Sequence, residues 1–343
     1  MWLIYKFKKV EYPLIFLAGL VVVLFCSTML ALSEEPFKKV TVLLDWVPNT
    51  NHTGMYVAIE KGFYQEEGLL VDVIQPAEGG PAALIAAGQA EFGISYQEQV
   101  TFARTSKEPL PVVAIAAILQ HNTSGFASPM AKGIKRPRDF EGKKYGGWGS
   151  PIEEATIKAL MDLDGADFSK TEIVTIGAID FFAAVQEYVD YTWIYYGWDG
   201  VASEIKNFPI NFIFLQDYAP ELDYYTPVII AREQLLVREP ELVRKFLKAT
   251  EKGYLLAIEN PELAVQDLLK NAPEIDQDLA MASQKYLAKE YLAEAPFWGV
   301  MEAQRWEGYA RWLYERGLIT KMLEVESAFT NNFLAGPGKE NQY

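Results

Sequence analysis

Cysteine and histidine are nearly absent from this chain. Its 343 residues include one cysteine, Cys26, and two histidines, His52 and His121. A single cysteine excludes a disulfide within the chain. A zinc site of the usual cysteine and histidine type is nearly excluded as well, and we expect no metal ion and no other cofactor.

Basic charge is also scarce. The chain has 31 lysine and arginine residues against 46 aspartate and glutamate residues, which gives a net charge of −15. Binding to the phosphate backbone of a nucleic acid needs a basic face, so we do not expect a nucleic-acid partner. The acidic balance favours solubility and does not identify a substrate.

Apolar and aromatic residues, in contrast, are plentiful. Half of the residues are hydrophobic and 22 % are charged, so a large packed core is possible and global disorder is not expected. The length suits two lobes of ordinary domain size better than one small core. The 19 tyrosines, 19 phenylalanines and 8 tryptophans fit either a ring-rich core or a binding pocket with aromatic walls.

Residues 1–33 have the layout of an export signal, because three lysines precede an uncharged, largely apolar run over residues 12–33. This run is long enough to span a bilayer, and the basic flank favours export of everything after it. Three fates are open: cleavage before Glu34, retention as a membrane anchor, or lipidation of Cys26, which the bulky Phe25 disfavours. The alternative to an export signal is that this segment forms a helix buried in the core of the protein.

Strand-like runs alternate with helix-like segments after residue 36, which predicts an α/β fold with mostly parallel sheets. We predict one lobe over residues 36–125 plus 226–330, including C-terminal helices, a second lobe over 126–225, and a flexible tail over 331–343. The turn-rich stretch 120–137 is predicted to hold the first crossing between lobes. The expected strands span 38–45, 69–74, 92–95, 112–119, 143–147, 173–176, 191–196, 212–215 and 228–231, and the main expected helices span 54–61, 81–87, 97–106, 151–161, 181–188, 242–259, 261–270, 277–292 and 301–316.

Polar and aromatic residues follow several of these strands, at the edge where open α/β sheets bind ligands. Trp46 offers a flat face to an aromatic ring, or it caps the core beneath its loop. Asp45 and Asn49 could pair with the polar edge of a ring, although Asn49 is also an ordinary turn residue. His52 is either a ligand contact or part of a helix N-terminus, and Tyr96 follows the strand at 92–95.

A glycine-rich turn at Gly147 leads into the helix expected from Pro151. Free N–H groups at such a helix start suit an oxygen of a carboxylate, formyl or phosphate group. Gly147, Ser150 and Glu153 are candidate ligand contacts, and Ser150 is also a good N-cap, with Glu153 closing a capping box. The two roles are compatible.

The densest aromatic cluster ends the strand expected at 191–196. Trp193 and Tyr195 share one face of that strand, and one of its two faces is expected to be core. Trp193 is kept as a candidate because it lies near the strand end, and Tyr196 and Trp198 lie closer to the turn. Asp199 is either a partner for a ring amine or a solvated acid of the turn.

Several of these segments together resemble a known family. They are Asp45–Gly54, Lys61–Tyr64, Gly88–Ile94, Gly147–Pro151 with Glu153, and Trp193–Gly200. Over roughly residues 38–320 the chain resembles periplasmic-type solute-binding proteins of ABC importers. Within them it is similar to the branch that binds the thiamine precursors formylaminopyrimidine and hydroxymethylpyrimidine, which is related to sulfonate and nitrate binders.

The resemblance implies a type II periplasmic-binding-protein fold, with two lobes and a ligand cleft between them. It also implies an exported monomer, periplasmic or at the cell surface, that has no catalytic residues. Its ligand would be a small aromatic pyrimidine, and its partners would be the permease and ATPase subunits of an ABC importer.

The same family contains enzymes that make hydroxymethylpyrimidine phosphate, and the chain departs from them. They carry a lysine and a histidine where this chain has Ser95 and Gln99, and a cysteine-rich run where it has no cysteine beyond Cys26. The lysine would hold pyridoxal phosphate, so this departure favours binding over synthesis. A sulfonate, nitrate or riboflavin-like ligand is a further alternative, as is a transmembrane sensor. An anion binder should place an arginine in its site, and the quoted segments have none.

Overall fold

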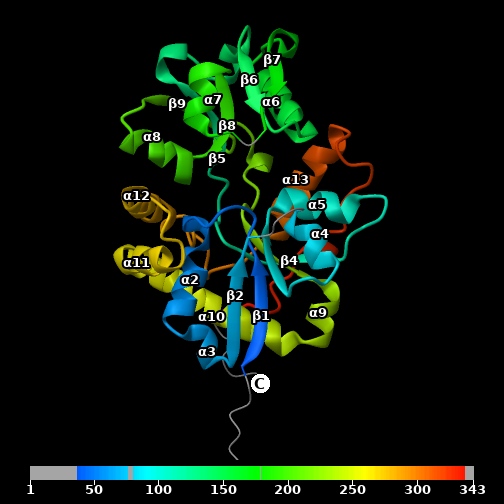
Figure 1. Ribbon diagram of the computed structural model, residues 1–343. Coiled ribbons are helices and arrows are strands. Elements are labelled where there is room, and N and C mark those ends of the chain that lie inside the picture. Colours follow the sequence, from blue (N-terminus) through cyan, green and yellow to red (C-terminus); the bar gives the residue numbers. More distant parts are fainter. Residues whose placement is uncertain (1–36, 76–79, 178, 337–343) are drawn as a thin grey trace, which may run out of the picture. The chain divides into compact units, whose positions relative to one another are not determined.

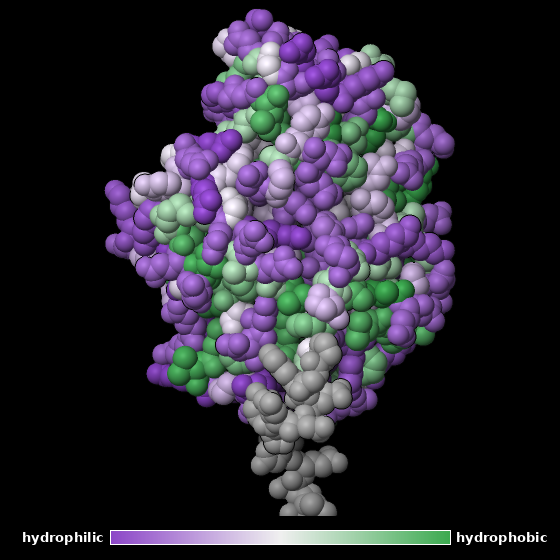
Figure 2. Space-filling model, turned by 180° about the vertical axis from the view of Figure 1, so that it is seen from behind, coloured by the Kyte–Doolittle hydropathy of each residue, from purple (hydrophilic) through white to green (hydrophobic). Residues whose placement is uncertain are grey.

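A computed structural model describes residues 37–75, 80–177 and 179–336 (Figure 1). The predicted export signal or anchor, Cys26 and the last part of the predicted tail lie outside these ranges. In the described part of the chain, no helix combines the length and the apolar character needed to cross a bilayer. Figure 2 shows one face of the chain, on which hydrophilic side chains predominate and apolar ones form separate patches.

The first sheet has five strands in the order β2 (Leu69–Ile74), β1 (Lys38–Leu43), β3 (Phe92–Ser95), β10 (Val228–Arg232) and β4 (Val112–Ala117). β1 runs parallel to both β2 and β3, whereas β10 is antiparallel to β3 and β4. β4 is buried along its whole length, which agrees with its unbroken apolar sequence.

The second sheet repeats this arrangement with β7 (Glu172–Thr175), β6 (Lys144–Gly147), β8 (Tyr191–Tyr195), β5 (Ser124–Pro129) and β9 (Ile210–Phe214). β6 is parallel to β7 and β8, and β5 is antiparallel to β8 and β9. In both sheets the antiparallel strand comes directly after the chain has crossed from the other sheet. The two sheets therefore have corresponding strands, β1 with β6 and β3 with β8.

Helices flank both sheets (Figure 1). The first lobe carries α2 (Thr53–Glu60), α3 (Phe63–Glu66), α4 (Pro81–Ala86), α5 (Gln97–Thr105), α9 (Glu233–Arg238), α10 (Pro240–Glu259) and α11 (Pro261–Asn271). The second lobe carries α6 (Pro151–Leu163), α7 (Phe181–Glu187) and α8 (Val201–Ile205). The C-terminal part adds α12 (Gln277–Leu287), α13 (Ala303–Glu315) and α14 (Val325–Ala328).

The long helix α10 packs against α2, and two glycines allow the close approach. A Cβ atom added at Gly253 would lie 1.9 Å from the carbonyl oxygen of Gly54. The buried residues of α10 recur every three or four positions, as expected for a helix with one apolar face. Phe246 on that face stacks on Phe92 of β3, which fixes the helix to the sheet.

Two C-terminal helices contact both lobes. α13 places Trp306 in a core cluster of the first lobe, and Tyr309 and Trp312 in a core cluster of the second. On α12, Leu287 belongs to the first lobe's core, whereas Tyr286 packs against Tyr196 of the second lobe at 5.4 Å between ring centroids.

Most expected elements are confirmed, and β2 and β3 begin and end where they were predicted. The turn-rich stretch 120–137 also contains β5, an interior strand of the second sheet that was not predicted. Its glycine has a packing reason: a Cβ atom at Gly125 would lie 2.2 Å from the carbonyl oxygen of Ile213 on β9. The helix expected over 277–292 ends earlier, at Leu287.

Candidate functional site

The two corresponding strands β1 and β6 lead into similar loops, each with an exposed tryptophan near its start. Trp46 follows the end of β1 by three residues and is 50 % exposed, and Trp148 directly follows β6 and is 49 % exposed. Large apolar side chains left half exposed at the carboxyl ends of sheet strands are candidates for ligand contact.

The next pair of corresponding strands, β3 and β8, brings a tyrosine from each lobe together. Tyr96 directly follows β3, and Tyr195 ends β8. Their ring centroids lie 6.5 Å apart, with 24° between the ring planes. A ligand ring stacked on both tyrosines, about 3.5–4 Å from each, would need a spacing of roughly 7–8 Å between the two tyrosine rings. A ligand ring could therefore enter between them after the lobes separate by about an ångström.

Asp45 lies under this aromatic group, and two neighbours hold its carboxylate. Tyr96 donates its hydroxyl to Asp45 Oδ2 at 2.6 Å, and His52 Nε2 lies 2.8 Å from Asp45 Oδ1. The other ring nitrogen, His52 Nδ1, accepts the backbone N–H of Asn49 at 3.2 Å, so Nε2 is the donor to Asp45. Burial alone would raise the pKa of Asp45, but the bonds from His52 and Tyr96 outweigh it and lower the pKa.

Asn49 and His52 are thereby occupied within their own loop. The Asn49 side chain accepts the N–H of Asn51 at 2.9 Å and donates to the carbonyl of Val47 at 2.9 Å, which caps a short 3₁₀ helix. The His52 side chain is fully buried. Of the loop residues predicted to meet a ligand, Trp46 is exposed, whereas Asn49 and His52 fix the position of Asp45.

The expected turn before α6 is present, but its N–H groups are not free. Glu153 accepts the backbone N–H groups of Trp148, Gly149 and Ser150 at 2.8–3.1 Å, and also the hydroxyl of Tyr145 at 2.6 Å. The predicted capping box between Ser150 and Glu153 is confirmed. The expectation that these N–H groups are free for a ligand oxygen was wrong, because those of Trp148, Gly149 and Ser150 already donate to the buried Glu153 carboxylate.

Gly147 makes room for this carboxylate. A Cβ atom at position 147 would lie 1.9 Å from Glu153 Oε1 and 2.6 Å from the Tyr145 ring. The glycine predicted as a ligand residue therefore has a structural role, namely to admit Glu153 beneath the turn.

The cluster at the end of β8 divides between two environments. Trp193 is 7 % exposed and packs beside Trp148 at 5.6 Å between centroids, and its indole N–H has no acceptor among the described residues. Tyr196 turns away, since its hydroxyl binds Glu204 at 2.6 Å and its ring packs on Phe212.

Trp198 and Asp199 lie in a π-helical turn, Tyr196–Gly200. Burial, together with the nearby Asp180, raises the pKa of Asp199 to about 7. Asp180 caps the start of α7, so the charged groups acting on Asp199 belong to the second lobe and not to the Asp45 group.

Three residues were missing from the predicted set: Tyr195, which faces Tyr96, Trp148, which packs beside Trp193, and Glu98, which follows Tyr96 by two positions. Burial, and then the nearby Glu153, raise the pKa of Glu98 to about 7. The repeated order of strands carries a signal for the first two, because Trp148 and Tyr195 occupy the places in the second sheet that Trp46 and Tyr96 occupy in the first. To find that signal one must know which strands pair with one another, and composition and periodicity do not give this information.

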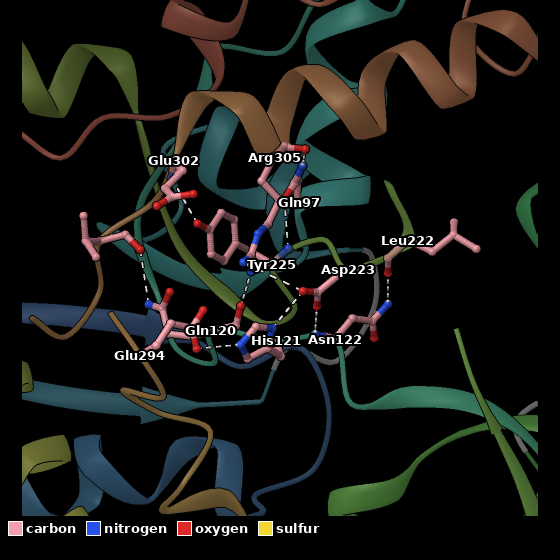
Figure 3. A network of polar contacts seen from close by, with 11 residues as sticks. Gln97, Gln120, His121, Asn122, Leu222, Asp223, Tyr225, Glu294, Glu302 and Arg305 are labelled. Carbon is pink, nitrogen blue, oxygen red and sulfur yellow. Dashed lines mark hydrogen bonds and ion pairs between the residues drawn. The ribbon is translucent and has the colours of Figure 1, made fainter. Parts of the chain in front are cut away.

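A polar network joins the two crossings between the lobes (Figure 3). His121 lies on the first crossing and Asp223 on the return crossing, with His121 Nδ1 2.7 Å from Asp223 Oδ2. The other ring nitrogen, His121 Nε2, lies 2.9 Å from Glu294. Asn122 adds a backbone N–H to Asp223 at 2.8 Å, and Arg305 on α13 lies 3.8 Å from the same carboxylate.

His121 is therefore a cation that bridges two carboxylates. The bond to Asp223 raises its pKa, burial opposes this, and Glu294 adds to the rise, so that the pKa reaches about 9. Since the folded pKa lies above the ordinary value of 6.5, this stabilisation is complete below about pH 6.5 and is lost as the pH rises through 9.

We expect wild-type protein to lose roughly 1–2 kcal/mol of unfolding free energy between pH 7 and 9.5 from this group, after allowance for its partial exposure. His121→Gln should be less stable than wild type at pH 7, and the difference should shrink towards pH 9.5. Urea unfolding across this range measures both. An equal difference at both pH values would contradict the bridge.

Comparison with known families identifies the chain. A sequence profile described as NMT1/THI5-like matches residues 49–264. The chain belongs to the NMT1/THI5-like family. A formylaminopyrimidine-binding protein of Halalkalibacterium halodurans is 30 % identical over 316 residues, which cover 89 % of this chain and 94 % of that protein. A 4-amino-5-hydroxymethyl-2-methylpyrimidine phosphate synthase of Legionella pneumophila is 25 % identical, over 86 % of this chain and 92 % of the enzyme.

Solved structures confirm the predicted fold class. The alkanesulfonate-binding protein SsuA from Xanthomonas axonopodis pv. citri has a TM-score of 0.64 and 11 % sequence identity, over 85 % of this chain and 98 % of that one. The chain thus has the two-lobed α/β fold of periplasmic binding proteins. At this identity the likeness concerns the fold and not the ligand.

Proposed function

We propose that this NMT1/THI5-like protein is the exported solute-binding component of an ABC importer and binds an aminopyrimidine precursor of thiamine. The observation that carries the proposal is the pair of tyrosines, one from each lobe, that face one another at 6.5 Å. Trp46 and Trp148, both about half exposed, follow corresponding strands of the two sheets. Rings from two lobes suit a planar ligand held by stacking and enclosed by hinge closure.

The charges of the site favour a ligand with hydrogen-bond donors. Asp45, Glu98 and Glu153 are acidic, and the N–H groups at the start of α6 are taken by Glu153. A sulfonate or nitrate would need such donors for its oxygens. An aminopyrimidine instead presents amino and ring-nitrogen groups along its edge. The indole N–H of Trp193, which has no acceptor among the described residues, can donate a hydrogen bond to an acceptor on the ligand.

The proposal assigns a role to each residue of the site. In the proposal Trp46, Tyr96, Trp148 and Tyr195 contact the ligand ring, and Asp45 orients Tyr96. Asn49, His52, Gly147, Ser150 and Glu153 shape the two loops, and Tyr196, Trp198 and Asp199 belong to the second lobe's outer turn. The permease and ATPase would recognise the closed form of the monomer.

Synthesis of the pyrimidine is the alternative function, because the family includes the synthase of Legionella pneumophila. The observation against it concerns the position at which the family's enzymes carry lysine. Here Ser95 is fully buried and donates its hydroxyl to Gln99 at 2.9 Å. Neither side chain can form a Schiff base with pyridoxal phosphate, so a new absorbance band on adding that compound would revive the enzymatic function.

Titration calorimetry tests the proposal. We expect formylaminopyrimidine or hydroxymethylpyrimidine to bind with micromolar or tighter affinity, and ethanesulfonate and riboflavin to give no heat at the same concentrations. The absence of heat with both pyrimidines at millimolar concentration, or tighter binding of the sulfonate or riboflavin, would overturn it.

A further inference from the structure

Glu98 is a carboxyl close in sequence to Tyr96 that has no structural partner among the residues of the site. It is the second residue of α5, two positions after Tyr96, and is half-buried. It acts electrostatically on Tyr195 of β8, on Tyr224 before β10 and on Tyr309 of α13. Glu98 therefore lies close enough to the facing pair, Tyr96 and Tyr195, to act on both electrostatically.

The three carboxyls of the site differ in how their oxygens are used. Asp45 accepts one bond at each oxygen, and Glu153 accepts four bonds in all. For Glu98 the described ranges contain no hydrogen-bond donor to either oxygen and no ion pair. Glu98 is therefore the acid of this group whose oxygens are free to accept hydrogen bonds from a ligand.

No cation balances Glu98 among the described groups that act on it. The charged and titratable groups facing it are Glu153 at the start of α6, Tyr96 on its own segment, and the three tyrosines named above. Burial and Glu153 together raise its pKa to about 7. The carboxyl thus exchanges its proton with solvent near neutral pH.

We propose that Glu98 binds the amidine-like edge of the ligand, a ring nitrogen beside an amino group, through two hydrogen bonds that share one proton. One carboxyl oxygen accepts an amino N–H. The other oxygen and the ring nitrogen hold a single proton between them, as carboxylic acid with neutral ring or as carboxylate with protonated ring. Both forms contain the same atoms and the same net charge, so no co-reactant is involved. This inference rests on the proposed aminopyrimidine ligand.

Proton linkage is the consequence that distinguishes this pairing from simple stacking. Above the pKa of Glu98, the free protein must take up one proton when the ligand binds. The affinity should then fall on the order of tenfold per pH unit on the alkaline side. A glutamine at position 98 offers a carbonyl to the amino group and an N–H to the ring nitrogen without any proton uptake.

The experiment is calorimetry with hydroxymethylpyrimidine at pH 8.5 in two buffers of different ionisation enthalpy. Wild type should take up close to one proton per ligand and bind about 15-fold more weakly than at pH 7. Glu98→Gln should take up none and should bind more tightly than wild type at pH 8.5. Glu98→Ala should bind weakly at every pH, and Glu154→Gln, at an exposed position of α6, should behave as wild type.

Two outcomes would overturn the inference and are distinguishable. Retained binding without proton uptake in wild type, or uptake that persists in Glu98→Gln, would reject the role of Glu98 and leave the aminopyrimidine ligand in place. The absence of any binding by wild type, with its fold verified by its melting transition, would reject both.

Discussion

Replacing Tyr195 by leucine is expected to weaken hydroxymethylpyrimidine binding by about 30- to 150-fold. The ring contributes a stacking energy of about 0.5–1.5 kcal/mol, and burial of its face against the ligand contributes about 1.5 kcal/mol more. The sum, about 2–3 kcal/mol, corresponds to that change in dissociation constant. Calorimetry at pH 6.5 measures it.

Tyr195→Phe is the matched control for this prediction. It keeps the ring that faces Tyr96 and should retain the affinity to within about threefold, since stacking depends on the ring and not on the hydroxyl. Equal melting temperatures of the two variants would exclude a general loss of fold. A leucine variant that binds as well as wild type would show that the ligand does not use the space between the two tyrosines.

The second large effect concerns the carboxylate beneath the turn before α6. Glu153→Ala removes the acceptor for three backbone N–H groups and for the Tyr145 hydroxyl. We expect the unfolding free energy to fall by roughly 2–4 kcal/mol, because the freed donors lose a buried, charged partner. Urea unfolding measures this loss. Glu154→Ala, at an exposed position in the same helical turn, should change stability by less than about 0.5 kcal/mol.

The same substitution should open an anion site at the position that the Glu153 carboxylate fills in wild type. The vacated position is surrounded by N–H groups at a helix start, which suits sulfate. Sulfate at tens of millimolar should therefore raise the melting temperature of Glu153→Ala by several degrees more than that of wild type or Glu154→Ala, because a ligand that binds only the folded state stabilises it. Sodium chloride of equal ionic strength serves as the salt control. Equal sulfate effects on all three proteins would contradict the assignment.

The sequence predicts the elements of this fold well where local patterns decide them. Apolar runs such as β4 and spaced apolar residues such as those of α10 are visible without tertiary information. β5 was missed because its Gly125 is required by the carbonyl of Ile213 on β9, and a long-range steric requirement looks like a turn signal in composition. The capping box at Ser150 was predicted from spacing alone.

The site was predicted less completely, for reasons that particular residues illustrate. Spacing placed Glu153 in the capping box, but it could not show that the carboxylate also takes the N–H groups of Trp148 and Gly149. Strand alternation put Tyr195 on the face of Trp193 and did not show that the strand ends there, which leaves its ring facing Tyr96. Glu98 has no motif, since its role depends on residues more than fifty positions away.

A crystal structure of the protein with hydroxymethylpyrimidine bound tests the central claim most directly. We predict a ring stacked between Tyr96 and Tyr195, with the two tyrosine centroids moved apart from 6.5 Å to roughly 7–8 Å and with the amino edge of the ligand directed at Glu98. A ligand bound outside the two tyrosines, or one that rests on a single lobe, would contradict the account.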